Sequence, residues 1–219
     1  INLTGDLDAF TFTGNVGDRI IMDAVATSGA SFNTYMALYP PGGGASPAYT
    51  SGDRMEYQLP ASGTWTLVIM DSGFDHTGTY ELSLLNVTSG PHTSGSDTDG
   101  GVILSNEIKT GQFQQGVDFD VFTFSGLAGQ RVLLVGVATG GGLHNTSLAL
   151  YPPSGFVAEV ASNSGDRIDW QLQRTGTYTV VIEDYGNDNA GTYTLSHLNL
   201  TGGPLTNGGD ANGGPIVSN

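Results

Sequence analysis

The sequence has no cysteine, few cations and no long apolar run. The absence of cysteine excludes disulfide bridges, thiolate catalysis and cysteine-based zinc sites. Only 6 residues are Lys or Arg, against 21 Asp or Glu, so the formal net charge is -15. We therefore expect no nucleic-acid partner, since binding a phosphate backbone requires clustered cations. The longest strongly apolar run, residues 132–138, is too short to span a bilayer, so we expect no membrane insertion.

Motifs for catalysis are also missing. The chain contains no Gly-x-Ser-x-Gly, no His-Glu-x-x-His and no phosphate-binding loop. It has four histidines, and none of them recurs when the two halves of the chain are aligned: His76, His92, His144 and His197. A duplicated active site should appear twice. The sequence therefore predicts a protein that is not an enzyme, with its histidines on the surface or in loops.

Glycine and aspartate are abundant instead. The chain has 34 Gly, and 16 of its acidic residues are Asp against 5 Glu. Asp bonds to the backbone of its own turn and disfavours helix interiors, so this composition indicates many turns between strands. Several Asp carboxylates together would also suit Ca²⁺, the one cofactor that the composition suggests.

The chain repeats itself once. Asp-Leu-Asp-Ala-Phe-Thr-Phe at residues 6–12 returns as Asp-Phe-Asp-Val-Phe-Thr-Phe at residues 118–124, a shift of 112. Other motifs return at a shift of 112 or, after one inserted residue, 113: Leu-Tyr-Pro-Pro at 38–41 and 150–153, Gly-Thr-Tyr at 78–80 and 191–193, and Gly-Pro at 90–91 and 203–204. We predict two tandem domains, residues 1–91 and 102–204, separated by a Gly/Asp linker at 92–101.

The ends of the chain carry further pieces of the repeat. Gly-Gly-Val-Ile-Leu-Ser-Asn at residues 100–106 opens the second copy, and Gly-Gly-Pro-Ile-Val-Ser-Asn at 213–219 matches it. Ile1 aligns with Phe113, so the first copy has no counterpart of residues 103–112 and is expected to lack its first strand.

Two explanations of this pattern remain open. The sequence is either a two-repeat part of a longer array, or residues 205–219 hold a linker and a strand that is donated to the first domain of another copy. In the second case Ile216 and Val217 would bind beside the strand that carries Phe10 and Phe12.

Each copy has the pattern of short strands. Phe10 and Phe12 alternate with threonines, as do Phe122 and Phe124, which is typical of half-buried strands. Clusters of Gly, Asn, Asp, Ser and Pro interrupt such segments, and no segment has a helical period. The sequence therefore predicts an all-β fold of two tandem antiparallel β-sandwich domains, jelly-roll-like in character.

Several motifs follow one another in the same order in both copies. They are Asp-x-Asp-x-Phe-x-Phe, Gly-x-x-Gly-x-Arg, Leu-Tyr-Pro-Pro and Gly-Thr-Tyr-x-Leu-Ser. This series resembles the bacterial and archaeal pre-peptidase C-terminal (PPC) domain over nearly the whole of both copies. The resemblance implies a jelly-roll-like sandwich appended to secreted proteins, some of which bind Ca²⁺ or insoluble polymers such as collagen and polysaccharide. No catalytic domain accompanies the two copies.

Aspartates recur in three kinds of place and are the candidate metal ligands. They are the Asp-x-Asp pairs Asp6, Asp8, Asp118 and Asp120, the loop residues Asp71, Asp75, Asp184 and Asp188, and the junction residues Asp97, Asp99 and Asp210. Each kind has an alternative. Arg19 and Arg131 can neutralise the pairs, the loop carboxylates can satisfy backbone amides, and the junctions can be plain linkers.

Two further groups of residues are candidates for contact or modification. Most aromatic residues are expected in the cores, which leaves Tyr35, Tyr49 and Tyr185 as candidates for binding a polymer. Asn-x-Ser/Thr sequons for glycosylation occur at Asn2, Asn86, Asn145 and Asn199.

Together these features predict a secreted or cell-surface protein. The main hypothesis is a non-catalytic structural or adhesive repeat protein of a surface layer or filament, whose partner is a further copy of itself. The alternative is a polymer-binding module of a secreted hydrolase, with carbohydrate or collagen as its partner. No basic segment followed by an apolar one stands at Ile1, so we expect a signal peptide to be absent or already removed.

Overall fold

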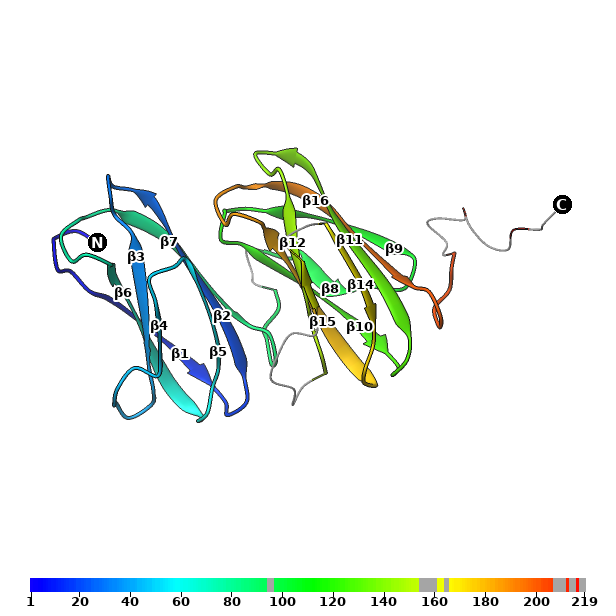
Figure 1. Ribbon diagram of the computed structural model, residues 1–219, viewed down its shortest axis with the longest axis horizontal. Coiled ribbons are helices and arrows are strands. Elements are labelled where there is room, and N and C mark those ends of the chain that lie inside the picture. Colours follow the sequence, from blue (N-terminus) through cyan, green and yellow to red (C-terminus); the bar gives the residue numbers. More distant parts are fainter. Residues whose placement is uncertain (94–96, 154–160, 164–165, 207–211, 213–215, 217–219) are drawn as a thin grey trace. The chain divides into compact units, whose positions relative to one another are not determined.

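The computed structural model describes residues 1–93, 97–153, 161–163, 166–206, 212 and 216. In these residues the protein is all-β (Figure 1). The chain divides into two compact units, Ile1–Pro91 and His92–Asn219. The described part contains no helix of the length and apolarity needed to cross a membrane.

The first unit is a sandwich of two antiparallel sheets. Its strands are β1 (Asp8–Gly14), β2 (Arg19–Ser28), β3 (Thr34–Tyr39), β4 (Ala48–Thr50), β5 (Arg54–Gln58), β6 (Gly63–Asp71) and β7 (Thr79–Asn86). One sheet has the order β1-β6-β3-β4 and the other the order β5-β2-β7. β1 and β7 are therefore edge strands, with a neighbour on one side only.

The second unit has counterparts of all seven strands and two more. The counterparts are β10 (Phe119–Gly126), β11 (Arg131–Gly141), β12 (Thr146–Tyr151), β13 (Ala161–Asn163), β14 (Arg167–Gln171), β15 (Gly176–Asp184) and β16 (Gly191–Asn199). The additional strands are β8 (Gly100–Val102) and β9 (Glu107–Phe113). The sheets have the orders β13-β12-β15-β10-β8 and β14-β11-β16-β9.

The two units share their pairing registers. Asp8 lies opposite Ile69 in the β1–β6 pair, and Asp120 lies opposite Ile182 in the β10–β15 pair. The predicted all-β fold of antiparallel sandwiches is confirmed. One pairing departs from it, because β8 runs parallel to β10.

Alternating side chains of facing strands form one core in each unit. In the first unit Trp65, Leu67 and Ile69 of β6 pack with Ile20 and Met22 of β2, all nearly or fully buried. In the second unit the equivalent positions of β15 and β11 do the same: Tyr178, Val180, Ile182, Val132 and Leu134. Burying each such side chain contributes about 2 kcal/mol, and this apolar burial holds the two sheets of a unit together.

Candidate functional site

One continuous segment closes both sheets of the second unit. β8 adds to the edge of β10, and β9 adds to the edge of β16 (Figure 1). Between the two strands Ile103 is 0% exposed in the core and donates its backbone N–H to the carbonyl oxygen of Thr123 at 3.0 Å. The segment therefore supplies two edge strands and one buried side chain.

Three residues fit this segment to its place. Gly100 has a φ of +130°, and a Cβ there would lie 2.5 Å from the carbonyl oxygen of Val121, so only glycine fits. The hydroxyl of Ser105 donates to the carbonyl oxygen of Pro204 at 2.9 Å and accepts the N–H of Asn199 at 2.9 Å. Asn106, with a φ of 60°, donates its N–H to the carbonyl oxygen of His197 at 2.6 Å.

The end of the chain repeats these fitting residues. Gly213, Ile216, Ser218 and Asn219 stand where the second unit has Gly100, Ile103, Ser105 and Asn106. We call residues 213–219 the donor motif. The side chain of Ile216 is 97% exposed. Two of the predicted site residues, Val217 and Asp210, lie outside the described part of the chain.

The first unit leaves the corresponding edges open. Within Ile1–Pro91, all of which the structure describes, no strand lies on the outer side of β1 or of β7. Phe10 of β1 is 41% exposed, whereas its counterpart Phe122 is 1% exposed. Leu84 of β7 is 42% exposed, whereas its counterpart His197 is 3% exposed. We call these two open edges, with Phe10 and Leu84, the acceptor edge.

Ile1 lies at one end of the acceptor edge. It is 8% exposed, its carbonyl oxygen accepts the N–H of Gly78 at 3.2 Å, and its amino group donates to the carbonyl oxygen of Gly78 at 3.0 Å. Phe113, the last residue of β9, pairs with Gly191 in the same register. Ile1 thus occupies the position of Phe113, as the alignment predicts, and the six positions of β9 before it have no counterpart beside β7.

In the second unit the structure joins aspartates from two separate motifs. One carboxylate oxygen each of Asp97, Asp99 and Asp120 lie within 4.8 Å of one another. Asp120 is 0% exposed. Its Oδ2 accepts the hydroxyl of Tyr193 at 2.6 Å, and its Oδ1 is buried without a hydrogen-bond partner. The linker that carries Asp97 and Asp99 therefore lies against the start of β10.

The electrostatics of this cluster favour a cation. Burial raises the pKa of Asp120 to about 8; the charges of Asp97, Asp118 and Asp99 act in the same direction, and the Tyr193 hydrogen bond acts against them. A hard divalent ion would neutralise the repulsion and provide a partner for the orphaned Oδ1. The donor set therefore fits Ca²⁺, with Asp97, Asp99 and Asp120 as the residues that would hold it.

The other Asp-x-Asp residues have partners within the protein. Backbone N–H groups of Asn2 and Leu7 donate to the carboxylate of Asp6, and the Tyr80 hydroxyl donates to Asp8 at 2.7 Å. Asp118 accepts the N–H of Gln114 at 2.8 Å. The arginines considered as their partners form ion pairs elsewhere, Arg19 with Glu56 and Arg131 with Asp169. These contacts correspond to the turn-capping alternative.

The loop aspartates hold their own turns. Asp71 is buried, and burial alone would raise the pKa of its carboxyl, but the N–H groups of Asn33, Asp75, His76 and Gly73 lower it to about 2. The second unit repeats the arrangement, since the Asp184 carboxylate accepts N–H groups of Gly186, Asp188 and Asn189. Asp75 pairs with His76 at 2.8 Å, and Asp188 bonds to Asn189. Backbone donors thus satisfy both buried carboxylates.

The candidate contact tyrosines lie at the surface to different degrees. Tyr49 is 69% exposed and Tyr185 is 57% exposed. Tyr35 is half-buried and stacks on Tyr49, with ring centroids 6.1 Å apart and an interplanar angle of 14°. The stacked pair stands on the neighbouring strands β3 and β4 of the first unit.

The prediction that all four histidines lie on the surface or in loops is wrong for His197. It is 3% exposed within β16 and packs against Phe124, with ring centroids 4.3 Å apart. Burial lowers its pKa, although the backbone of Leu104 and Ile103 and the charge of Glu107 act in the opposite direction. The alternation of Tyr193 and Leu195 with polar neighbours would have placed His197 on the inner face.

The four sequons differ in how accessible their amides are. The side-chain N–H₂ of Asn86 donates to Asp18 at 2.9 Å, and that of Asn199 donates to Gln130 at 2.9 Å. Both side-chain oxygens also accept backbone N–H groups of the following turn. A glycan at either position would replace one of the donor hydrogens of a side chain that is not exposed, whereas Asn2 and Asn145 are exposed.

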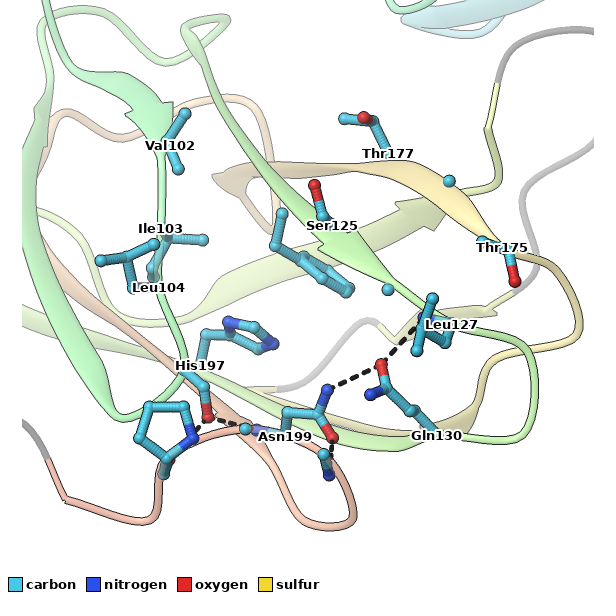
Figure 2. A pocket seen from close by; sticks show the side chains of 17 residues that line it. Val102, Ile103, Leu104, Ser125, Leu127, Gln130, Thr175, Thr177, His197 and Asn199 are labelled. Atoms are coloured by element: carbon cyan, nitrogen blue, oxygen red, sulfur yellow. Dashed lines mark hydrogen bonds between the residues drawn. The ribbon is translucent and has the colours of Figure 1, made fainter.

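A cleft of about 440 Å³ lies in the second unit beyond the end of β8. Figure 2 shows the side chains that surround it, with Ile103 and His197 at one side and Leu127 and Gln130 at the other. Its rim carries three exposed aliphatic residues, Val102 (62%), Leu104 (63%) and Leu127 (57%). The described lining residues include no Asp or Glu.

Comparisons with known proteins assign the chain to no family. No family model and no curated protein match it. Among solved structures, a periplasmic inhibitor of g-type lysozyme, PliG from Aeromonas hydrophila, is 16% identical over 45% of this chain and 96% of that chain, with a TM-score of 0.36. The pre-peptidase C-terminal domain of a collagenase from Bacillus anthracis is 23% identical over 45% and 94%, with a TM-score of 0.36. The secreted serine protease VesC from Vibrio cholerae is 12% identical over 90% and 47%, with a TM-score of 0.29. With identities and TM-scores this low, the likenesses carry no argument about function.

Proposed function

We propose that the chain is a non-catalytic extracellular protein of tandem PPC-type sandwiches that serves as a structural or adhesive repeat of a surface layer or filament. Copies join end to end by strand complementation. The donor motif of one copy binds the β1 side of the acceptor edge of the next copy as far as Leu84, and takes the place that β8, Ile103 and Asn106 take in the second unit.

One observation carries the proposal. The donor motif repeats the residues that fit β8 and residues 103–106 to their place, and the first unit exposes the edge of β1 that corresponds to the β10 edge covered by β8. Gly213 matches the position where Val121 leaves no room for a Cβ, and Ile216 matches the fully buried Ile103. The acceptor groups are present as well, since Thr11 and Leu84 stand where Thr123 and His197 offer their carbonyl oxygens.

The energetics favour an occupied acceptor edge. Moving Ile216 from 97% exposure to a site like that of Ile103 would contribute about 2 kcal/mol, and covering Phe10 and Leu84 would add to it. The backbone groups on the open side of β1 would gain hydrogen-bond partners. Leu84 in place of His197 also makes the acceptor edge more apolar than its filled counterpart.

A mixing experiment tests the proposal. The Ile216→Asp chain keeps an acceptor edge but has a defective donor motif, and the Leu84→Asp chain keeps a donor motif but has a defective acceptor edge. Each alone should stay monomeric in sedimentation velocity, and an equimolar mixture should give one heterodimer, whereas the unaltered chain forms longer species. Thr206→Asp, upstream of the donor motif, is the matched control and should assemble normally. Assembly of the Ile216→Asp chain on its own would refute strand donation.

We further propose that Ca²⁺ binds at Asp97, Asp99 and Asp120. The support is the burial of Asp120, its unpartnered Oδ1 and the approach of two linker carboxylates. The ion would tie the segment before β8 to the start of β10 and so stiffen the entrance to the second unit.

A second candidate function is binding of an extracellular polymer. The exposed Tyr49 stacked on Tyr35 supports it, because flat aromatic pairs at a surface suit sugar rings and extended peptides. Retention on chitin, cellulose or collagen, lost in the Tyr49→Ala chain and kept in the Tyr185→Ala chain, would favour this function.

A further inference from the structure

The loop between β6 and β7 places an aromatic side chain in an unfavourable backbone conformation. Phe74 has a φ of 61° and is 57% exposed. Its N–H donates to the carbonyl oxygen of Asp71 at 3.1 Å, and the same bond joins Asn187 to Asp184 at 3.3 Å in the second unit. Asn187 has a φ of 54°. Asn tolerates this left-handed conformation, whereas a bulky aromatic residue rarely adopts it.

The first unit therefore holds a strained and exposed phenyl ring where the same loop in the second unit holds a residue suited to the turn. Strain of this kind persists only where the surrounding structure enforces it, and it clusters at functional positions. Within the first unit the ring is more than half exposed, so the partner of Phe74 is to be sought outside that unit.

The cleft of the second unit has the chemistry to receive such a ring. Its volume of about 440 Å³ accommodates one phenyl group, and it is walled by Phe124 and Ile103 with Val102, Leu104 and Leu127 exposed at its rim. An aromatic ring in the cleft would pack mainly against the exposed aliphatic side chains of the rim, because Phe124 itself is only 3% exposed. Since no Asp or Glu is among the described lining residues, the acidic loop around Phe74 would meet no like charge there.

Strand donation would bring this loop and this cleft together. In the second unit β8 begins opposite Val121, close to Phe119, which lies opposite Glu183 at the start of the Asn187 loop. A donor strand beside β1 would therefore begin at the end of the first unit that carries Phe74. On the donor chain Pro204 lines the cleft, and the nine residues to Gly213 span at most about 30 Å when fully extended.

We propose that Phe74 of one copy inserts into the cleft of the second unit of the neighbouring copy whose donor motif completes its first unit. This inference rests on the proposed strand donation and adds a second contact to the same junction. The tether makes the contact effectively intramolecular once the donor motif is bound, so a single ring is enough to affect the affinity.

The test uses the heterodimer of the Ile216→Asp and Leu84→Asp chains. Phe74→Asn, introduced into the Ile216→Asp chain, should raise the dissociation constant about tenfold or more, the change expected for one large apolar side chain left in water. The same substitution should raise the melting temperature of the first unit, because Asn suits a φ of 61°. A purely local role for Phe74 moves the melting temperature without moving the dissociation constant.

A partner substitution identifies the cleft. Leu127→Asp in the Leu84→Asp chain should weaken the heterodimer to a similar degree, and combining it with Phe74→Asn should cost little more than either alone. Val16→Asp, at an equally exposed aliphatic residue of the first unit, is the control and should leave the dissociation constant unchanged. Additive effects, or an unchanged constant with Phe74→Asn, would overturn the contact while strand donation stands. Failure of the heterodimer itself would overturn both.

Discussion

Phe10 and Phe122 occupy the same position in the two sandwiches, opposite Leu67 and Val180, yet Phe10 is 41% exposed and Phe122 is 1% exposed. The difference arises from one segment, β8 with Ile103, which covers Phe122 and has no counterpart within Ile1–Pro91. The two sandwiches thus differ in which strand edges are covered, and the edge of β1 that carries Phe10 is the exposed one.

Replacing Gly100 by alanine should destabilise the second unit by about 2 kcal/mol or more, because the new Cβ would lie 2.5 Å from the carbonyl oxygen of Val121. Urea unfolding followed by Trp170 fluorescence measures the change. Gly101→Ala is the matched control: its φ is also positive, at +92°, but no atom lies within 4 Å, so its cost should be smaller. Equal costs would argue against the close approach of β8 to β10.

Adding Ca²⁺ should raise the melting temperature of the second unit by several degrees, and EDTA should reverse the shift, since a ligand that binds only the folded state stabilises it. Asp99→Asn should abolish most of the response by removing one carboxylate of the cluster. Asp75→Asn, in the loop of the first unit, should leave it intact. A melting temperature that EDTA does not change would contradict the proposed Ca²⁺ site.

The stability of the first unit should fall between about pH 4 and pH 2. The pKa of Asp71 is lowered to about 2 from its ordinary value of 3.8, so its contribution is complete above the unfolded value and is lost as the pH falls through the folded one. The loss should amount to about 2 kcal/mol. Unfolding at each pH, followed by Trp65 in a Trp170→Phe background, measures it. Asp71→Asn should flatten the dependence, and an unchanged slope in that variant would contradict the assignment.

His197→Leu should stabilise the second unit by about 1 kcal/mol, since it replaces a buried imidazole, whose ring nitrogens make only poor contacts with the backbone of Leu104 and Ile103, with the residue found at Leu84. Because the folded pKa of His197 lies below its unfolded value, the unaltered protein should also lose stability as the pH falls below about 6.5. The variant should lose this dependence. A destabilised variant would show that the imidazole makes a favourable buried contact.

Local patterns made the sandwiches predictable. The alternation of Phe10 with Phe12 and its return at Phe122 and Phe124 reflect the two-residue period of a strand with one buried face. Neighbouring residues alone are therefore enough to predict such a strand. The alignment of Ile1 with Phe113 likewise needed only the repeat, and the structure places both residues beside equivalent glycines.

Features that depend on distant residues were not predictable in this way. Asp97 and Asp120 belong to separate motifs of the sequence. Only the parallel pairing of β8 with β10 brings the linker that carries Asp97 to the start of β10. The strain at Phe74 is a property of its φ angle. The sequence shows only that the first copy has Phe where the second copy has Asn187. The expectation for His197 is wrong because a histidine is most often exposed, whereas its place in the alternating strand β16 puts this one on the inner face.

The open edge of β1 has one more consequence. Every junction of the proposed assembly would join the tail of one copy to the first unit of the next, so the assembly would be a polar filament with unlike tips. One tip would present an empty edge and the other a free tail. Growth and arrest could then be controlled separately at each tip, for instance by a short peptide of sequence 213–219 that blocks one and leaves the other untouched.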